Sequence, residues 1–237
     1  MRPAVVVLIS GALLGAGSAC GGGGGKSDTL RAKRNISAAA QGQAKSMLLK
    51  LSDFPNGWRA SAAAKDAAGE RKFRNCIGVD YSDLTIAGDA TSKDFAIGDS
   101  TTANSEAQVF ASPEQAGKGV RRFSQSMEGS GIRGCLKKFV AKETPSDYTL
   151  GEIQVGDLRF TAPAGLDAAK AWQVEIPFEP KSGSSGLSVS AFLDIVMLLK
   201  GVAVSQIQTT DAVTPLDPDL RDHLVQTVGG RMAAASG

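Results

Sequence analysis

The sequence predicts an α+β fold with an antiparallel sheet of four or more strands. Between residues 172 and 178, apolar residues alternate with polar residues or proline, which is typical of a half-buried strand. Residues 187–199 and 202–209 form two further strand-like runs joined by Lys200 and Gly201, and this pattern indicates a β-hairpin. Helical patterns stand between the strands, and the links are of hairpin length, which favours α+β over a parallel α/β sheet.

Three local elements are predicted in the first half of the chain. Residues 43–51 carry apolar side chains at helical spacing, so a helix is expected there. The segment at 52–58 (SDFPNGW) contains Pro, Asn and Gly, and we expect it to end this helix with a turn. Residues 106–111 (EAQVFA) are expected to add a strand to the sheet.

Three further helices are predicted. Ser112, Pro113 and Gln115 form a helix start, because Ser caps the first turn and Pro suits the first helical position. The core-facing residues of this helix are expected to be Ala116, Val120, Phe123 and Met127. A short helix is predicted over residues 136–142, and the last helix begins after a capping Asp217. The apolar side of the last helix consists of Leu220, Leu224, Val228 and Met232.

Residues 1–19 have the three parts of a secretory signal peptide. Arg2 gives a basic start, residues 4–14 are apolar, and residues 15–19 are small. The apolar stretch is well short of the ~20 residues that span a bilayer as a helix. We therefore expect an exported chain that only its N-terminus could hold to a membrane.

The GSAC motif that ends at Cys20 resembles a bacterial lipobox, in which the cysteine is lipidated and becomes the new N-terminus. Gly17 stands where the usual lipobox has Leu, so ordinary cleavage before Cys20, with secretion, stays an alternative. The glycine run and the charged residues that follow predict a flexible tether over residues 20–36. Palmitate-type acyl chains on Cys20 would anchor residues 37–237, a single domain, to the outer face of the cell membrane.

The number of cysteines bears on the same question. The chain contains three, and an odd number in an exported protein indicates a special role for one of them. If Cys20 carries lipid, Cys76 and Cys135 are left to pair with each other in an oxidising compartment. Such a disulfide would close a long loop and stabilise the domain by about 4 kcal/mol. Two separate buried thiols are the alternative.

Composition and spacing argue against several classes of partner and cofactor. The formal net charge of +2 at pH 7 argues against nucleic acid as a partner. The G-x-G-x-x-G pattern at 129–134 follows a predicted helix and not a strand, so no dinucleotide or other cofactor is expected. His223, the only histidine, is expected on a helix surface, and acidic pairs such as Asp80 and Asp83 are read as solvated charges. We therefore predict no metal site and no catalytic residue.

Short motifs along most of the chain resemble a known group of proteins. LLKLSDFPNGW at 48–58 resembles the opening of exported actinobacterial lipoproteins, which are similar to the extracellular sensor domain of PknH-type Ser/Thr kinases and to PsbP-like mycobacterial lipoproteins. Further motifs follow in the order that the group shows: VFASPEQA at 109–116, Cys135-Leu136, VGDLRF at 155–160 and DIVMLLKGVAV at 194–204. The resemblance implies a curved antiparallel sheet with helices mainly on one side, one or more disulfides, and a ligand-binding or sensing role.

The function we expect is that of a non-enzymatic, surface-tethered binding or sensor-like domain. Its ligand, a small molecule or a lipid, would lie between the sheet and its helices, in an apolar pocket lined by Trp172, Ile176, Phe192 and Val196. A hydrolase acting on cell-envelope material is an alternative, and it would need a cleft with paired carboxylates or an activated serine. A second alternative function is that of an interaction module for an envelope protein complex, which an exposed apolar patch would mark.

Overall fold

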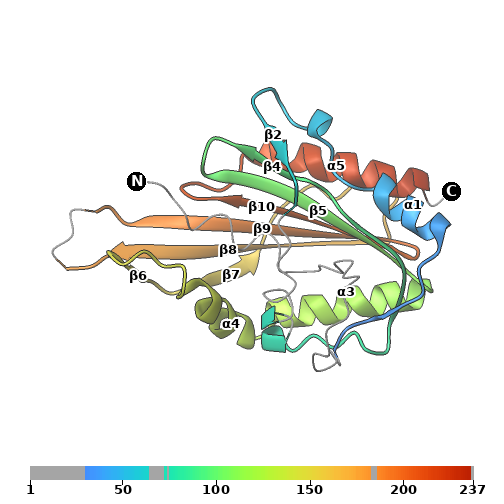
Figure 1. The fold of residues 1–237 in the computed structure, drawn as a ribbon, viewed down its shortest axis with the longest axis horizontal. Coiled ribbons are helices and arrows are strands. Elements are labelled where there is room, and N and C mark those ends of the chain that lie inside the picture. Colours follow the sequence, from blue (N-terminus) through green and yellow to red (C-terminus); the bar gives the residue numbers. More distant parts are fainter. Residues whose placement is uncertain (1–29, 64–71, 74, 183–185, 236–237) are drawn as a thin grey trace.

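The computed structural model describes residues 30–63, 72–73, 75–182 and 186–235. Within them lie ten strands: β1 (Lys33–Arg34), β2 (Arg59–Ser61), β3 (Thr85–Thr91), β4 (Asp94–Ile97), β5 (Thr101–Phe110), β6 (Tyr148–Leu150), β7 (Gln154–Asp157), β8 (Ala168–Pro180), β9 (Val189–Lys200) and β10 (Ala203–Asp211). They form one sheet in the order β1-β3-β5-β10-β9-β8-β6, with β4 joining β2 to β5 and with β7 paired to β8 (Figure 1). All pairs are antiparallel except β1 with β3. The α+β class and the antiparallel sheet are therefore confirmed.

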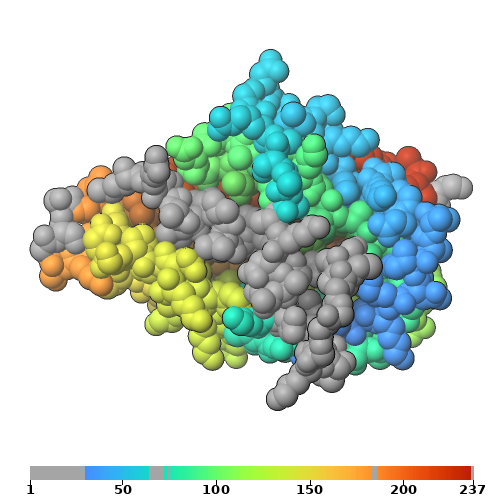
Figure 2. All heavy atoms as spheres, viewed as in Figure 1, coloured from blue at the N-terminus to red at the C-terminus, as the bar shows by residue number. Residues whose placement is uncertain are grey.

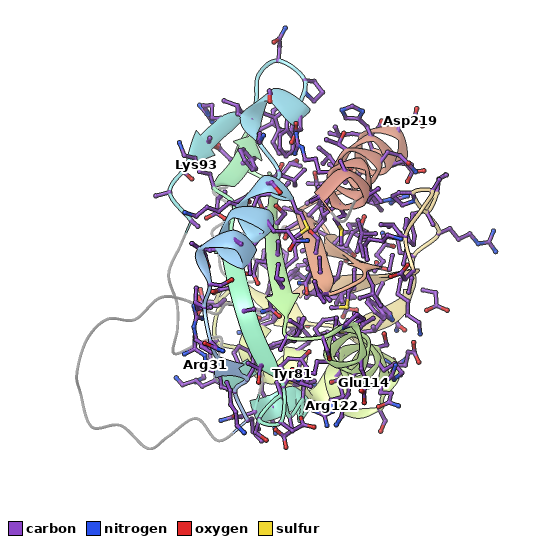
Figure 3. The ribbon with its side chains drawn as sticks, turned by 90° about the vertical axis from the view of Figure 1, so that its right-hand side faces the viewer. Arg31, Tyr81, Lys93, Glu114, Arg122 and Asp219 are labelled. Carbon is purple, nitrogen blue, oxygen red and sulfur yellow. A yellow bond between two sulfur atoms is a disulfide. The ribbon has the colours of Figure 1, made fainter. Side chains whose placement is uncertain are left out.

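Helices cover both faces of the sheet, which corrects the expectation that they lie mainly on one side. They are α1 (Ala38–Ser46), α3 (Pro113–Glu128), α4 (Gly131–Val140) and α5 (Pro218–Ala235), with a short 3-10 helix, η2 (Leu51–Asp53). One core cluster joins α3 and α4 to the sheet and a second joins α1 and α5 to it, and Figure 3 shows α1 and α5 above the sheet with α3 below. The reason lies in β9, where Ile195 belongs to the first cluster and its neighbour Val196 to the second. A strand that is apolar on both faces needs a covering layer on each.

The start of α3 agrees with the sequence prediction. The Ser112 hydroxyl accepts a hydrogen bond from the backbone N–H of Gln115 at 3.2 Å, and Pro113 occupies the first turn. The four residues predicted to face the core are buried: Ala116, Val120, Phe123 and Met127. In the core between α3 and the sheet, the rings of Phe123 and Trp172 pack edge to face, with centroids 5.7 Å apart. The cap and the apolar stripe together fix where α3 begins and how it is rotated.

The first helix begins and ends earlier than predicted. Ser37 caps α1 by accepting a hydrogen bond from the Ala40 backbone N–H at 3.2 Å, and α1 ends at Ser46, so the predicted helix over residues 43–51 is shifted. α1 lies almost on the backbone of β3, because a Cβ on Gly88 would stand 2.3 Å from the Ala40 carbonyl carbon. The position of α1 on the sheet therefore requires glycine at residue 88.

The folded part of the chain begins before residue 37. Lys33 and Arg34 form β1 and pair with Thr85 and Ile86 of β3, so the last part of the predicted tether (20–36) belongs to the sheet. The predicted signal peptide (residues 1–19), Cys20 and the glycine run lie outside the described residues.

The strand pattern of the second half is confirmed. β8 alternates as predicted, with buried side chains at Trp172, Val174, Ile176 and Phe178. β9 and β10 form the predicted hairpin, with Lys200 paired to Ala203 across the turn. The far ends of β8 and β9 extend beyond α3 and α5, and together with the yellow segment around β6 they form the narrow end of the molecule (Figures 1 and 2).

The last helix is held at both of its ends. Asp217 caps it by accepting hydrogen bonds from the N–H groups of Asp219 and Leu220 at 2.8 and 3.1 Å, as predicted. Near the other end, both Nη atoms of Arg231 donate to the Asp53 carboxylate, at 2.6 and 2.8 Å. Desolvation acts to raise the pKa of Asp53, but the hydrogen bonds from Arg231 and from the Lys50 backbone N–H outweigh it and lower the pKa.

Cys76 and Cys135 are joined by a disulfide, with their Cα atoms 5.6 Å apart. The bond ties the short helical stretch at 75–77 to the buried side of α4. Beside it, the rings of Phe73 and Phe139 meet edge to face, with centroids 5.5 Å apart. The pairing predicted from the number of cysteines is therefore confirmed, and it fixes the segment before β3 to the α3–α4 layer.

Candidate functional site

The central strands present polar side chains to the interior on the α3 side of the sheet. In the pairing of β10 with β5, Gln206 lies opposite Glu106, and Gln208 lies opposite Asn104. Paired residues of neighbouring strands point to the same face. Val204 belongs to the α3–α4 core cluster. Residues two apart on a strand face the same way, so Gln206 and Gln208 also point to the α3–α4 side of the sheet.

We call this set the polar strip. It contains Asn104, Glu106 and Gln108 of β5 and Gln206, Gln208 and Thr210 of β10. All six side chains are buried, and Gln206, Gln208 and Thr210 have only 0%, 1% and 2% of their surface exposed. Large polar side chains are rarely buried to this degree in the middle of a sheet.

The amides of the polar strip on β10 lack hydrogen-bond partners within the described structure. This holds for both the oxygen and the nitrogen of Gln206 and of Gln208, and for the hydroxyl of Thr210. A buried polar group without a partner costs about 1–3 kcal/mol, and most such groups in folded proteins are satisfied. The unmet groups therefore mark a place where a ligand or bound water can supply hydrogen bonds.

The polar strip borders apolar side chains on β9. Gln206 is paired with Met197, Gln208 with Ile195 and Thr210 with Leu193, and all three partners belong to the α3–α4 core cluster. The polar strip therefore places hydrogen-bonding groups next to buried apolar side chains. This combination is typical of small-molecule sites, which are mostly apolar with a few placed polar groups.

Carboxylate groups lie beside the polar strip on β3 and β4, and beyond β9 the ammonium group of Lys170 on β8 lies 2.8 Å from Glu128 of α3. The Nδ2 of Asn104 lies 3.4 Å from a carboxylate oxygen of Asp94 on β4. On the outer side, Asp89 of β3 pairs with Gln108, and its carboxylate accepts two hydrogen bonds from Arg34 at 2.6 and 3.0 Å. The guanidinium of Arg34 is thus already engaged with a carboxylate.

The four residues predicted to line an apolar pocket do not face the same way. Trp172 and Ile176 lie in the core on the α3–α4 side of the sheet, whereas Val196 lies in the core on the α1–α5 side. Phe192 shares the parity of Val196 on β9 and is half-buried. The structure therefore divides the predicted set between two faces, and a ligand-binding role for any of the four stays a prediction.

The opposite face holds a buried ion pair. A carboxylate oxygen of Asp194 on β9 lies 3.3 Å from Nη1 of Arg221 on α5, and the two side chains have 2% and 8% of their surface exposed. Gln173 donates to the other carboxylate oxygen at 2.9 Å, and Arg221 also donates to the Arg159 carbonyl. Desolvation nevertheless raises the pKa of Asp194. These contacts fix the start of α5 on the sheet, so we assign the pair a structural role.

Other charged residues singled out in the sequence have structural roles or lie on the surface. Asp83 pairs with Lys118 and Arg122 of α3, and Figure 3 shows Arg122 beside Tyr81 at the lower edge. Asp80 accepts a hydrogen bond from the Ser82 backbone N–H. His223 is exposed on α5, as predicted. Among the described residues there is no cluster of three metal-binding side chains, and no helix there is long and apolar enough to cross a bilayer.

Sequence patterns did not reveal the polar strip. The run SQIQTT at 205–210 is polar except for Ile207, and such a run also suits a strand whose polar side chains meet water. One signal could have revealed the polar strip. The run belongs to a hairpin whose other strand, β9, is apolar on both faces, and such a strand lies in the centre of a sheet, so its neighbour is expected to be buried as well.

Comparisons with known proteins found a likeness among solved structures, with low sequence identity. No protein-family model and no curated protein sequence matches the chain. The extracellular domain of PknH from Mycobacterium tuberculosis is similar in structure, with a TM-score of 0.36 and 10% sequence identity, over 82% of this chain and 95% of that chain. The polar strip is therefore defined by the side chains of this chain alone.

Proposed function

We propose that this chain is an exported, membrane-tethered binding domain with a non-enzymatic, sensor-like role, and that its ligand binds at the polar strip. One observation carries the proposal: the amides of Gln206 and Gln208 are buried at the centre of the sheet and lack partners within the described structure. Stability alone would favour apolar side chains here, because each unmet group costs about 1–3 kcal/mol. Departures of this kind from the rules of packing are typical of functional sites.

The surroundings of the polar strip support a small ligand. A molecule bound there would contact the amides of β10 and, one strand away, Met197 and Ile195. Polar groups of the ligand would replace the missing hydrogen bonds, while its apolar parts would pack against β9. A small polar molecule or the head of a lipid both meet this description.

The tether is proposed from the sequence. Residues 1–19 have the pattern of a signal peptide, and Cys20 stands where a lipobox has its lipidated cysteine. Acylation of Cys20 would hold the domain at the outer face of the membrane. Intact mass spectrometry of protein from its own membrane tests this: we expect a chain that begins at Cys20 and carries the added mass of lipid. A chain that begins there without lipid would mean secretion.

Native mass spectrometry tests the ligand site. Protein purified from its own membrane should carry a bound molecule that is absent from the double variant Gln206→Leu, Gln208→Leu. The matched control is Gln125→Leu, because Gln125 is an exposed glutamine on α3, far from β10 in sequence, and this variant should keep the molecule. Retention by the double variant, or no bound molecule in any of the proteins, would contradict the proposed site.

A further inference from the structure

We infer that the ligand of the polar strip is uncharged and carries hydroxyl or amide groups, which both donate and accept hydrogen bonds. The inference rests on the proposed function, because it names the chemistry of a ligand at the same site. It follows from the kinds of unmet groups on β10, from the charges around them and from their spacing.

The unmet groups require both kinds of hydrogen bond. Each glutamine amide offers N–H donors and a carbonyl acceptor, and in Gln206 and Gln208 both atoms lack partners in the described part of the chain. A carboxylate or phosphate group only accepts hydrogen bonds, so it would leave the two carbonyl oxygens unmet. An ammonium group only donates, so it would leave the two Nε2 atoms unmet. Hydroxyl and amide groups can satisfy both atoms of each glutamine.

The acidic side chains nearest the amides of β10 disfavour an anionic ligand in particular. Glu106 is buried directly opposite Gln206, and Asp94 approaches Asn104 beside Gln208. An anion at the amides of β10 would lie near these acidic side chains, and like charges in a desolvated site repel strongly. Two cationic side chains on this face of the sheet already hold carboxylates: Arg34 pairs with Asp89, and Lys170 of β8 pairs with Glu128 of α3.

The spacing indicates an extended ligand. Gln206, Gln208 and Thr210 are successive residues of one strand face, so the row is about 14 Å long at the usual rise of a strand. Thr210 adds a hydroxyl that also lacks a partner among the described residues. A ligand with two or three hydroxyl- or amide-bearing units, such as a short neutral oligosaccharide or an uncharged peptide, would match the row.

The test compares neutral probes with charged probes of the same size. The saccharide arm uses N,N′-diacetylchitobiose and, as its charged counterpart, N-acetylglucosaminyl-N-acetylmuramic acid. The peptide arm uses N-acetyl-alanyl-alanine amide and the same peptide with a free carboxylate. The readout is the side-chain amide NMR signals of Gln206 and Gln208 in the intact processed protein labelled with nitrogen-15, assigned by loss of each signal in Gln206→Leu and Gln208→Leu.

We expect the neutral probe of at least one arm to shift both side-chain signals. Its charged counterpart should bind with an affinity at least about tenfold lower. The arm that responds identifies the source of the polar groups. Equal or tighter binding of a charged probe would overturn the ligand class while leaving the site intact. Silence of all four probes would also overturn it, and would mean that water fills the strip. A different result would contradict the location of the site: retention of the bound molecule by the double variant Gln206→Leu, Gln208→Leu in native mass spectrometry.

Discussion

Gln206 on β10 lies directly opposite Met197 on β9, so a buried amide without a partner and a buried thioether share one face of the sheet. The boundary between the polar and apolar halves of this face thus runs between two hydrogen-bonded strands. A ligand at this boundary would reach both kinds of side chain.

The polar strip is expected to lower stability in the absence of ligand. Gln206→Leu replaces the amide, with its two unmet polar atoms, by apolar methyl groups. The free energy of unfolding should therefore rise by about 1 kcal/mol. Urea denaturation of ligand-free protein measures this. Gln125→Leu, on the exposed side of α3, should change the value by less than about 0.5 kcal/mol. A clear loss of stability in Gln206→Leu would show that the amide is satisfied.

Thr210 gives an isosteric version of the same test. Its hydroxyl is buried and has no partner among the described residues, so Thr210→Val should be neutral or slightly stabilising. Thermal unfolding without ligand is the measurement. Loss of about 1 kcal/mol or more would mean that the hydroxyl makes a hydrogen bond within the protein.

The ion pair of Asp53 and Arg231 is expected to anchor the end of α5. Arg231→Ala removes the two donors to a carboxylate that is almost fully buried, so the free energy of unfolding should fall by about 2–3 kcal/mol. Arg121→Ala, at an exposed position of α3, is the control and should have little effect. Equal stability of the two variants would contradict the role of the pair.

The two buried aspartates should give opposite pH dependences. The lowered pKa of Asp53 means that its contribution to stability is present above the usual aspartate pKa of 3.8 and is lost as the pH falls through the folded-state pKa. The raised pKa of Asp194 means that its contribution is present below 3.8 and is lost as the pH rises through the folded-state pKa. We therefore expect Asp53→Asn to flatten the acid side of the stability curve, and Asp194→Asn to reduce the fall toward neutral pH. Urea denaturation between about pH 3 and about pH 7 measures both slopes.

Gly88 should be intolerant of a side chain. Gly88→Ala places a Cβ 2.3 Å from the backbone of α1, so the helix must shift and stability should fall by about 2 kcal/mol or more. Gly134→Ala is the matched control, because no atom lies within 4 Å of a Cβ there and alanine favours the helical backbone of α4. Calorimetry should show a lower melting temperature for Gly88→Ala and an equal or higher one for Gly134→Ala.

Local signals predicted much of the fold. The cap at Ser112, the alternation of β8 and the turn at Lys200-Gly201 each depend on residues close in sequence, and each is present as predicted. α1 was misplaced because its apolar residues continue past its end, into a segment where Met47 is buried without being helical. The layers were misjudged because the two faces of β9 are both apolar, and its sequence does not say which helix covers each.

The sequence by itself determined the number of cysteines, the caps and stripes of α3 and α5, and the alternation of the long strands, because these properties are set by neighbours within a few residues. Only the tertiary structure decided that Phe192 and Val196 point away from Trp172, and that Gln206 and Gln208 are buried and not solvated. An alternating strand has the same pattern whether its polar face meets water or a second layer. That choice depends on strand order and on the helices that pack above and below, which residues far apart in the chain create together.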